Sequence, residues 1–343
     1  MSTCKLCKVD KLSNEFPPTT VSEDCDHPPL ICLRCVVDWC KKKWTCPHPG
    51  CSVHISKDDH TIQWFTAILE EMFKEYDTTY TPSVPQGSGS AVLNITVLNG
   101  DAFRIPYMQF MGLSDLQAHI ETKLKIPRNK QKLLFDNKEI TIYKPNGQPY
   151  TLSESNIPPF ATLYLVVLLY EIPEDFNHVV FDLHWGYPSS GRDYLDASCL
   201  AYQNTQFIGL ADFNSCGMKG ITHSGDLMDN RRRIGHHTIH VYLKKLPSNV
   251  THLFFTLSAW DSPNISKYPN PSLKFYEASN VHKDLCKTTF THARNSEAVI
   301  MCSVSRGSQG RWSVYESGKL SAGNANHYGP IKKTIRNLIA SGY

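Results

Sequence analysis

Four short stretches decide how the first fifty residues fold: Cys4-Lys-Leu-Cys7, Cys25-Asp-His27, Cys32-Leu-Arg-Cys35 and Cys46-Pro-His-Pro-Gly-Cys51. Each stretch supplies two thiolate or imidazole ligands, and zinc takes four such ligands in a tetrahedron. Eight ligands in four pairs therefore predict two zinc ions. A region this small cannot bury enough apolar surface to fold alone, so we expect zinc binding to provide much of its folding energy.

The chain as a whole has 343 residues and a formal net charge of +3. This length suggests two or three domains, and the small charge gives no argument for binding nucleic acid. The sequence has no apolar run long enough to span a membrane, and its start lacks the apolar core of a signal peptide. We therefore expect a protein of the cytoplasm or the nucleus, where clustered cysteines favour metal binding over disulfides.

Composition and apolar periodicity divide the chain into six segments. Ile62, Phe65 and Leu69 recur at helical spacing, whereas Pro, Gly and Ser dominate the stretch that follows. The predicted segments are a zinc finger (1–58), an amphipathic helix (59–80), a flexible linker (81–91), a small α+β domain (92–170), an acidic linker (171–177) and a β-sandwich (178–343).

The α+β segment has the order strand, strand, helix, strand, short strand, strand. An Asn99-Gly100 turn separates the first two strands, and a Leu- and Val-rich strand over 161–169 ends the segment. The last segment has many short strands separated by turn residues, which is typical of a sandwich, and a closing helix. Its predicted strands cover 179–183, 206–211, 238–243, 252–257, 272–278, 298–304 and 311–315, and its helix covers 331–339.

The order of the four ligand pairs resembles a RING finger. In that family the first and third pairs share one ion, and the second and fourth pairs share the other. The resemblance thus implies one site made by Cys4, Cys7, Cys32 and Cys35, and another made by Cys25, His27, Cys46 and Cys51. Cys40, His48 and His54 are spare candidates, because the gap after His27 is wider than is usual in the family.

RING ligases dock a ubiquitin-conjugating enzyme and act by orienting its thioester. The resemblance implies docking through Leu6, Trp39 and Pro47, which match the family's docking positions. Ser52 departs from the pattern, because many single-RING ligases have an Arg after the last zinc ligand. The Cys46–Cys51 stretch is instead similar to the first finger of RING-between-RING ligases. No later Cys/His cluster follows, so their two-step mechanism is not expected, and we interpret Cys40 as structural.

Residues 92–169 resemble ubiquitin, most specifically over 125–140, 152–157 and 161–168. The resemblance implies a ubiquitin-like fold with an exposed apolar patch formed by Leu98, Leu134, Tyr164 and Val166. Ubiquitin receptors or substrate proteins are the partners expected there. The segment continues into Glu171 rather than ending in Gly-Gly, so it is interpreted as a built-in module that is not conjugated.

Residues 178–343 resemble the TerD family of tellurite-resistance and stress proteins. The resemblance rests on residues 183–186, 195–198, 223–226 and 246–255. The family's sandwiches bind calcium through clustered carboxylates, for which Asp196 and Asp226 are the matching residues. Three arginines at 231–233 stand where the family is acidic, so we expect calcium binding to be lost.

His236 and His240 would face one side of a strand and could bind zinc, although we favour a solvated strand because no further ligand is evident. Together these features favour a RING-type ubiquitin ligase or ligase adaptor. Two alternatives remain open at this point. One is a non-enzymatic zinc-binding scaffold in ubiquitin signalling, and the other is a stress or metal-response protein led by its TerD domain.

Overall fold

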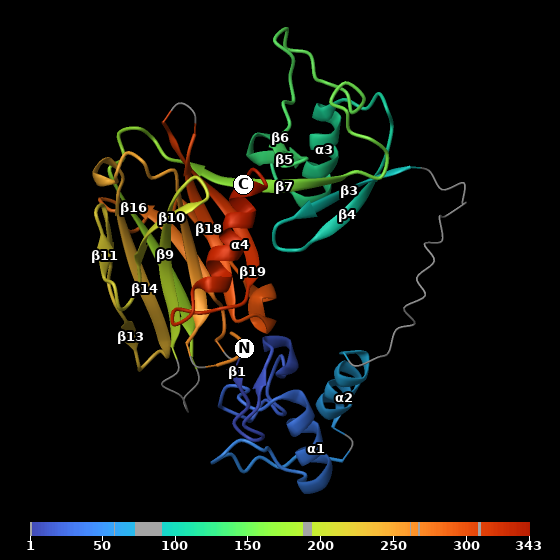
Figure 1. Ribbon diagram of the computed structural model, residues 1–343, viewed down its shortest axis with the longest axis vertical. Helices are drawn as coiled ribbons and strands as arrows, with labels where there is room; N and C mark the ends of the chain where they lie inside the picture. Colours follow the sequence, from blue (N-terminus) through green and yellow to red (C-terminus); the bar gives the residue numbers. More distant parts are fainter. Residues whose placement is uncertain are drawn as a thin grey trace.

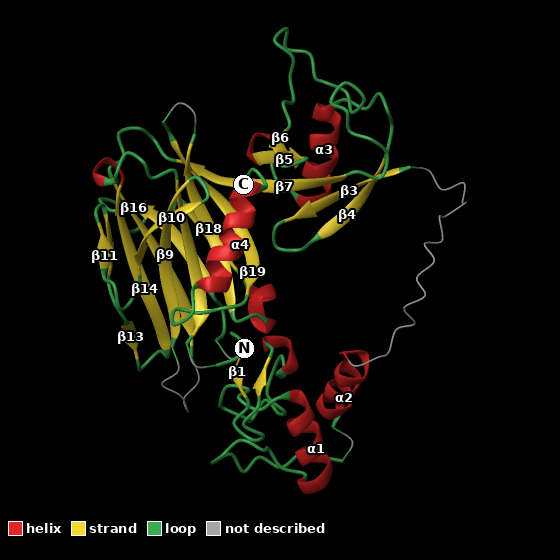
Figure 2. Ribbon diagram, viewed as in Figure 1, coloured by secondary structure: helices red, strands yellow, loops and turns green. Residues whose placement is uncertain are grey.

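The computed structural model is mostly β-sheet, and its parts follow one another along the chain (Figures 1 and 2). The second half of the predicted helix over 59–80 and most of the linker over 81–91 lie outside the described residues. The structure describes residues 2–57, 59–72, 91–187, 194–260, 262–266, 268–307 and 310–343.

The cysteine-rich region, residues 2–72, contains two helices and a small antiparallel pair of strands. Helix α1 begins directly after Cys32 and ends at Lys43. The next residue, Trp44, caps the helix with a left-handed backbone conformation. The last turn of α1 consists of three lysines, which interact favourably with the helix dipole. Its buried side packs with α2 into a core that includes Leu33, Val37 and Phe65. The elements are β1 (Ser2–Thr3), β2 (Asp10–Lys11), η1 (Ser13–Glu15), α1 (Leu33–Lys43) and α2 (His60–Met72).

The next part, which we call the 92–171 unit, has the element order that the sequence predicts. Strand β3 pairs antiparallel with β4 and parallel with β7, and β5 pairs with the other edge of β7. Helix α3 covers one face of this sheet, where Leu116 and Ile120 join the core. The elements are β3 (Val92–Val97), β4 (Ala102–Pro106), α3 (Leu113–Leu124), η2 (Arg128–Lys130), β5 (Gln131–Phe135), β6 (Lys138–Glu139) and β7 (Thr162–Glu171).

Strand β7 belongs to two parts of the molecule. Its first half pairs with β3, and residues 167–171 pair with β19 of the C-terminal part, so one continuous sheet joins them (Figure 1). The predicted linker over 171–177 is a short packed connection: Ile172 is buried and donates a backbone hydrogen bond to Trp312. The acidic residues of this segment predicted a linker, but the apolar side chain of Ile172 packs into the core of the sandwich.

The C-terminal part is a sandwich of two antiparallel sheets (Figure 2). One has the order β10-β9-β15-β18-β19, the other β11-β12-β14-β8-β16-β17, and β13 pairs with β14. The seven predicted strands are present, and the sequence analysis missed β9, β11, β12, β13 and β17. The strands are β8 (His178–Gly186), β9 (Leu195–Gln203), β10 (Gln206–Ala211), β11 (Gly217–Met218), β12 (Ile221–His223), β13 (Leu227–Asp229), β14 (Ile234–Tyr242), β15 (His252–Ala259), β16 (Ser272–Glu277), β17 (Cys286–Thr289), β18 (Ala298–Arg306) and β19 (Trp312–Ser321).

The first of these sheets is buried on both faces. In β9, Cys199 and Ala201 point into the core between the sheets, whereas Leu200 and Tyr202 pack under helix α4 (Gly329–Ala340). Side chains alternate between the faces of a strand, so a strand with both faces covered shows no alternation of apolar and polar residues. Because β9 lacks this alternation, its sequence did not predict a strand. None of the described helices is long and apolar enough to cross a membrane.

Candidate metal centres

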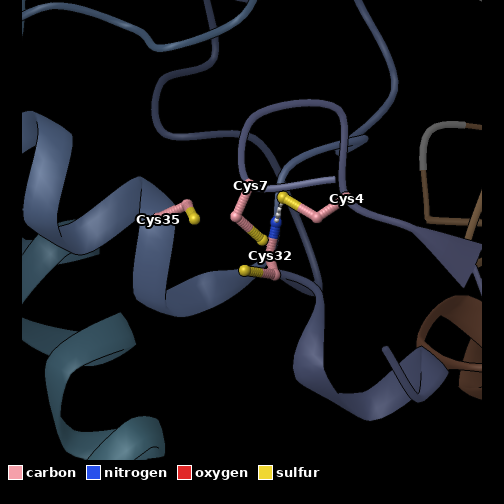
Figure 3. A group of neighbouring side chains, drawn as sticks. All are labelled: Cys4, Cys7, Cys32 and Cys35. Carbon is pink, nitrogen blue, oxygen red and sulfur yellow. Dashed lines mark hydrogen bonds between the residues drawn. The ribbon is translucent and has the colours of Figure 1, made fainter. Parts of the chain in front are cut away.

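The first ligand group consists of Cys4, Cys7, Cys32 and Cys35, whose sulfur atoms all lie within 4.8 Å of one another. Figure 3 shows Cys4 and Cys7 on one loop and Cys32 and Cys35 at the start of α1. The backbone N–H of Cys32 donates to Sγ of Cys4 over 3.3 Å. Burial raises the pKa of the Cys4 thiol, but N–H groups of Cys32, Cys7 and Leu6 lower it to about 7 overall. These N–H groups therefore favour the thiolate form of Cys4, the form that binds a metal.

The second group consists of Cys25, His27, Cys46 and Cys51, again within 4.8 Å. Nε2 of His27 lies 3.2 Å from Sγ of Cys46, and Nδ1 lies 3.1 Å from the carbonyl oxygen of Pro28. An Nδ1–H donated to that carbonyl leaves the Nε2 lone pair free for a metal and fixes the ring's orientation. The structure thus brings together the two groups of four that the resemblance implied, and both could hold zinc.

The three spare candidates lie outside these groups. Cys40 is fully buried, its thiol faces the carbonyl of Thr45, and burial raises its pKa to about 12. A thiol with so high a pKa is a poor nucleophile, which agrees with its interpretation as structural. His48 stacks on the ring of His27 at 3.9 Å between centroids, and His54 is exposed.

The residues predicted to dock a conjugating enzyme differ in exposure. Leu6 is 39% exposed, and Trp39 is half-buried, with its indole N–H 3.4 Å from Oγ1 of Thr45. Pro47, predicted as a contact residue, is buried next to His27 and Val36 in the wall of a small cavity. Ser52 is exposed.

The predicted apolar patch of the 92–171 unit is largely covered. Leu134 and Val166 are 2% and 1% exposed, because they pack against the last helix and the final residue, Tyr343. Leu98 is half-buried at the margin of the same cluster, and only Tyr164 remains well exposed, at 46%. The expected open patch is thus corrected to an internal interface. Helix α4 comes from the far end of the sequence, which a resemblance confined to residues 92–169 does not include.

The sequence of β7 contains a signal for this interface. Leu163, Leu165 and Val167 point to the core under α3, and Val166 points to the opposite face under α4. The uninterrupted apolar run over 165–169 indicates a strand buried on both faces. Tyr343 closes the interface, since its hydroxyl donates to the carbonyl of Glu316 over 2.8 Å.

The carboxylates predicted as calcium ligands do not gather into a ligand group. Asp226 accepts a hydrogen bond from Nε2 of His237 over 2.8 Å, and Nδ1 of that ring accepts from the N–H of Ala197. Asp196 is buried, and desolvation together with Asp226 and Asp212 raises its pKa to about 8. Among the described residues, no cluster of three ligands within 4.8 Å contains Asp196 or Asp226.

His236 and His240, considered together as zinc ligands, have different partners. Nδ1 of His236 contacts Asp182 over 2.9 Å, and Nδ1 of His240 contacts His178 over 2.9 Å. Both partners lie on β8, the neighbouring strand. These partners come from a neighbouring strand, so the spacing of residues within β14 does not reveal them.

The cysteine-rich region also contacts the sandwich. The carbonyl of Pro17 accepts a buried hydrogen bond from Asn264, and Ser13 lies 3.4 Å from Glu297. Arg233, one of the three arginines near the predicted calcium ligands, lies 3.8 Å from Asp26. That arginine therefore faces the cysteine-rich region.

No protein-family model matches the chain, and no curated protein is similar to it. Among solved structures, SAV2460, a protein of unknown function, is similar over 46% of this chain and 97% of its own, at 14% identity and a TM-score of 0.40. SCO6318 from Streptomyces coelicolor A3(2), a homologue of the telluride resistance protein TerD, is similar over 45% of this chain and 96% of its own. Its identity is 12% and its TM-score is 0.37.

Proposed function

We propose that the cysteine-rich region is a RING-type finger with two zinc ions that docks a ubiquitin-conjugating enzyme, so that the protein is a ubiquitin ligase or a ligase adaptor. The observation that carries this proposal is the interleaving of the ligand groups. The first and third ligand pairs form one group, and the second and fourth form the other. In this crossed arrangement, each zinc ion would connect the first half of the region to the second half.

The zinc ions would have a structural role, since each group supplies four protein ligands and leaves no position for a reacting water. Catalysis would then come from positioning a bound conjugating enzyme. Exposed Leu6 and half-exposed Trp39 are the candidate contacts, because apolar and aromatic side chains anchor protein interfaces.

The arrangement of β3, β4, α3, β5 and β7 supports a ubiquitin-like fold for the 92–171 unit, and the two facing sheets support a TerD-like sandwich. Since α4 covers Leu134 and Val166, we propose that this unit is held against the sandwich within the chain. Ubiquitin receptors would then meet only Tyr164 and its surroundings.

The proposal is tested with the full chain, zinc, activating enzyme, ubiquitin and a panel of conjugating enzymes. We expect ubiquitin chains to form, and Trp39→Ala and Leu6→Ala each to reduce their rate at least tenfold. Trp64→Ala is the matched control, since Trp64 is an exposed tryptophan on α2 that is not among the predicted contacts.

Three further outcomes have clear meanings. Activity that survives both substitutions would remove the docking surface from the proposal. An equal loss in Trp64→Ala would point to general destabilisation of the region. The absence of chains with every conjugating enzyme, in a zinc-loaded protein, would favour the non-enzymatic scaffold, which the buried Pro47 and the serine at position 52 also favour.

A further inference from the structure

A third cluster of metal-ligating side chains lies on the outer face of the sandwich, far along the chain from the cysteines. Asp182, His184 and His236 place their ligand atoms within 4.8 Å of one another. The cluster contains no thiol, so it differs in chemistry from the two groups of the cysteine-rich region. Nothing in the proposed function uses it.

Two neighbouring strands build this cluster. Asp182 and His184 are two residues apart on β8, so they share a face, while Phe181 and Leu183 point into the core. His236 on β14 stands directly opposite His184 in the register of the two strands. Because the central strands of a packed sheet are rigid, the three side chains have fixed starting positions.

The contacts within the cluster leave one ring nitrogen available. Oδ1 of Asp182 lies 2.9 Å from Nδ1 of His236, and Oδ2 lies 2.8 Å from Nε2 of His184. The second contact lacks hydrogen-bond geometry, so Nε2 of His184 is buried without a hydrogen bond. The two imidazole rings stack at 4.8 Å, nearly parallel, on the same side of the carboxylate. Two imidazoles and a carboxylate are the ligand set that zinc takes where it keeps one position open.

Charged side chains of both signs lie around the cluster. Asp182 is largely buried, and each of its carboxylate oxygens lies within 2.9 Å of an imidazole nitrogen. Lys274 stands opposite Asp182 on β16 and is the cation nearest in register. Of the arginines in the turn before β14, Arg232 lies 3.8 Å from Asp229 and Arg233 lies 3.8 Å from Asp26.

We propose that Asp182, His184 and His236 form a third metal site, which binds zinc or a similar first-row divalent ion with one position left for water. The ion would link β8 to β14 on the face opposite the core. The side chains of His184 and His236 are partly exposed, so the site would lie just below the outer surface of the sheet.

The test measures metal content in the full-length protein after zinc loading and gel filtration. Wild-type protein should retain three zinc ions, whereas His184→Asn and His236→Asn should retain two. His240→Asn is the matched control: it lies on the same strand and the same face as His236, pairs with His178, and should retain three. Thermal unfolding followed by circular dichroism checks that each variant is folded.

A second measurement identifies the ligands. Protein from which a mild chelator has removed the third ion, with zinc kept in the two cysteine groups, should give weak visible bands on cobalt addition without sulfur-to-cobalt charge transfer. Both the bands and the binding heat should vanish in His236→Asn. Wild-type protein that holds two ions under zinc excess and gives no heat with cobalt would overturn the proposal. So would a third ion that is lost equally in His240→Asn, or one whose spectrum shows sulfur ligation.

Discussion

The cysteine-rich region and the 92–171 unit differ in which parts of the chain lie around their key residues. In the first, all eight candidate ligands lie within residues 4–51, and the structure gathers them into two groups. In the second, Leu134 and Val166 are buried by Ile335, Leu338 and Tyr343, from the last fifteen residues of the chain. Candidate ligands that are close in sequence thus come together in the structure, whereas the exposure of a surface depends on every segment that packs on it.

The strongest way to test the first half of this comparison is to remove the metal. A strong chelator should unfold residues 2–72 while the sandwich stays folded, because a structural zinc contributes on the order of 10 kcal/mol or more. Hydrogen exchange measured by mass spectrometry should show loss of protection in α1 (residues 33–43) and unchanged protection in β15. Cys32→Ser should have the same effect, and Cys286→Ser, outside both groups, should have none.

Retained protection of α1 after complete zinc removal would show that its apolar core suffices for folding. In that case the spacing of the cysteines would predict a metal site without explaining the fold.

The second half of the comparison is tested at the interface under α4. Ile335 is fully buried in the cluster that contains Leu134 and Val166. Ile335→Ala should lower the free energy of unfolding by about 2–5 kcal/mol, the usual range for truncating a buried isoleucine. Arg336→Ala, at the next and exposed position, should change it by less than about 0.5 kcal/mol. Urea unfolding measures both, and exchange at β5 and β7 locates the effect.

If the two substitutions had equal, small effects, α4 would not be packed on the sheet. Leu134 and Val166 would then be free for partners, as the ubiquitin resemblance implied.

The sequence predicted most of what depends on neighbours along the chain. Apolar periodicity predicted the order of the elements in the 92–171 unit and seven strands of the sandwich. Residue type and spacing predicted the candidate zinc ligands. The covered patch was not predicted, because the covering helix follows some 160 residues after Val166. The same limit applies to the cluster at Asp182, since strand pairing brings His184 and His236 together across 52 positions.

Asp226 is a predicted calcium ligand whose carboxylate is occupied by one neighbouring side chain, that of His237. The sequence identified Asp196 and Asp226 as candidates and the arginines at 231–233 as unfavourable for calcium. It did not show that His237 is fully buried and donates to Asp226. With that oxygen already hydrogen-bonded, the carboxylates lack the oxygen-rich arrangement that calcium needs.

For a change of one pH unit, the smallest expected effect is that of the titration of Asp196, whose pKa is about 8 against an ordinary value of 3.8. Between these values the folded protein holds a proton that the unfolded chain releases, so stability falls as pH rises, by at most about 1.4 kcal/mol per unit. Asp196→Asn removes this titration. The variant should match wild type below pH 4 and become progressively more stable than wild type up to pH 8, as measured by thermal unfolding at several pH values. Calcium should leave the unfolding temperature of both proteins unchanged. A calcium-induced rise in wild type that Asp196→Asn abolishes would instead mean that the ion ionises Asp196, displaces Asp226 from His237 and rebuilds the acidic site.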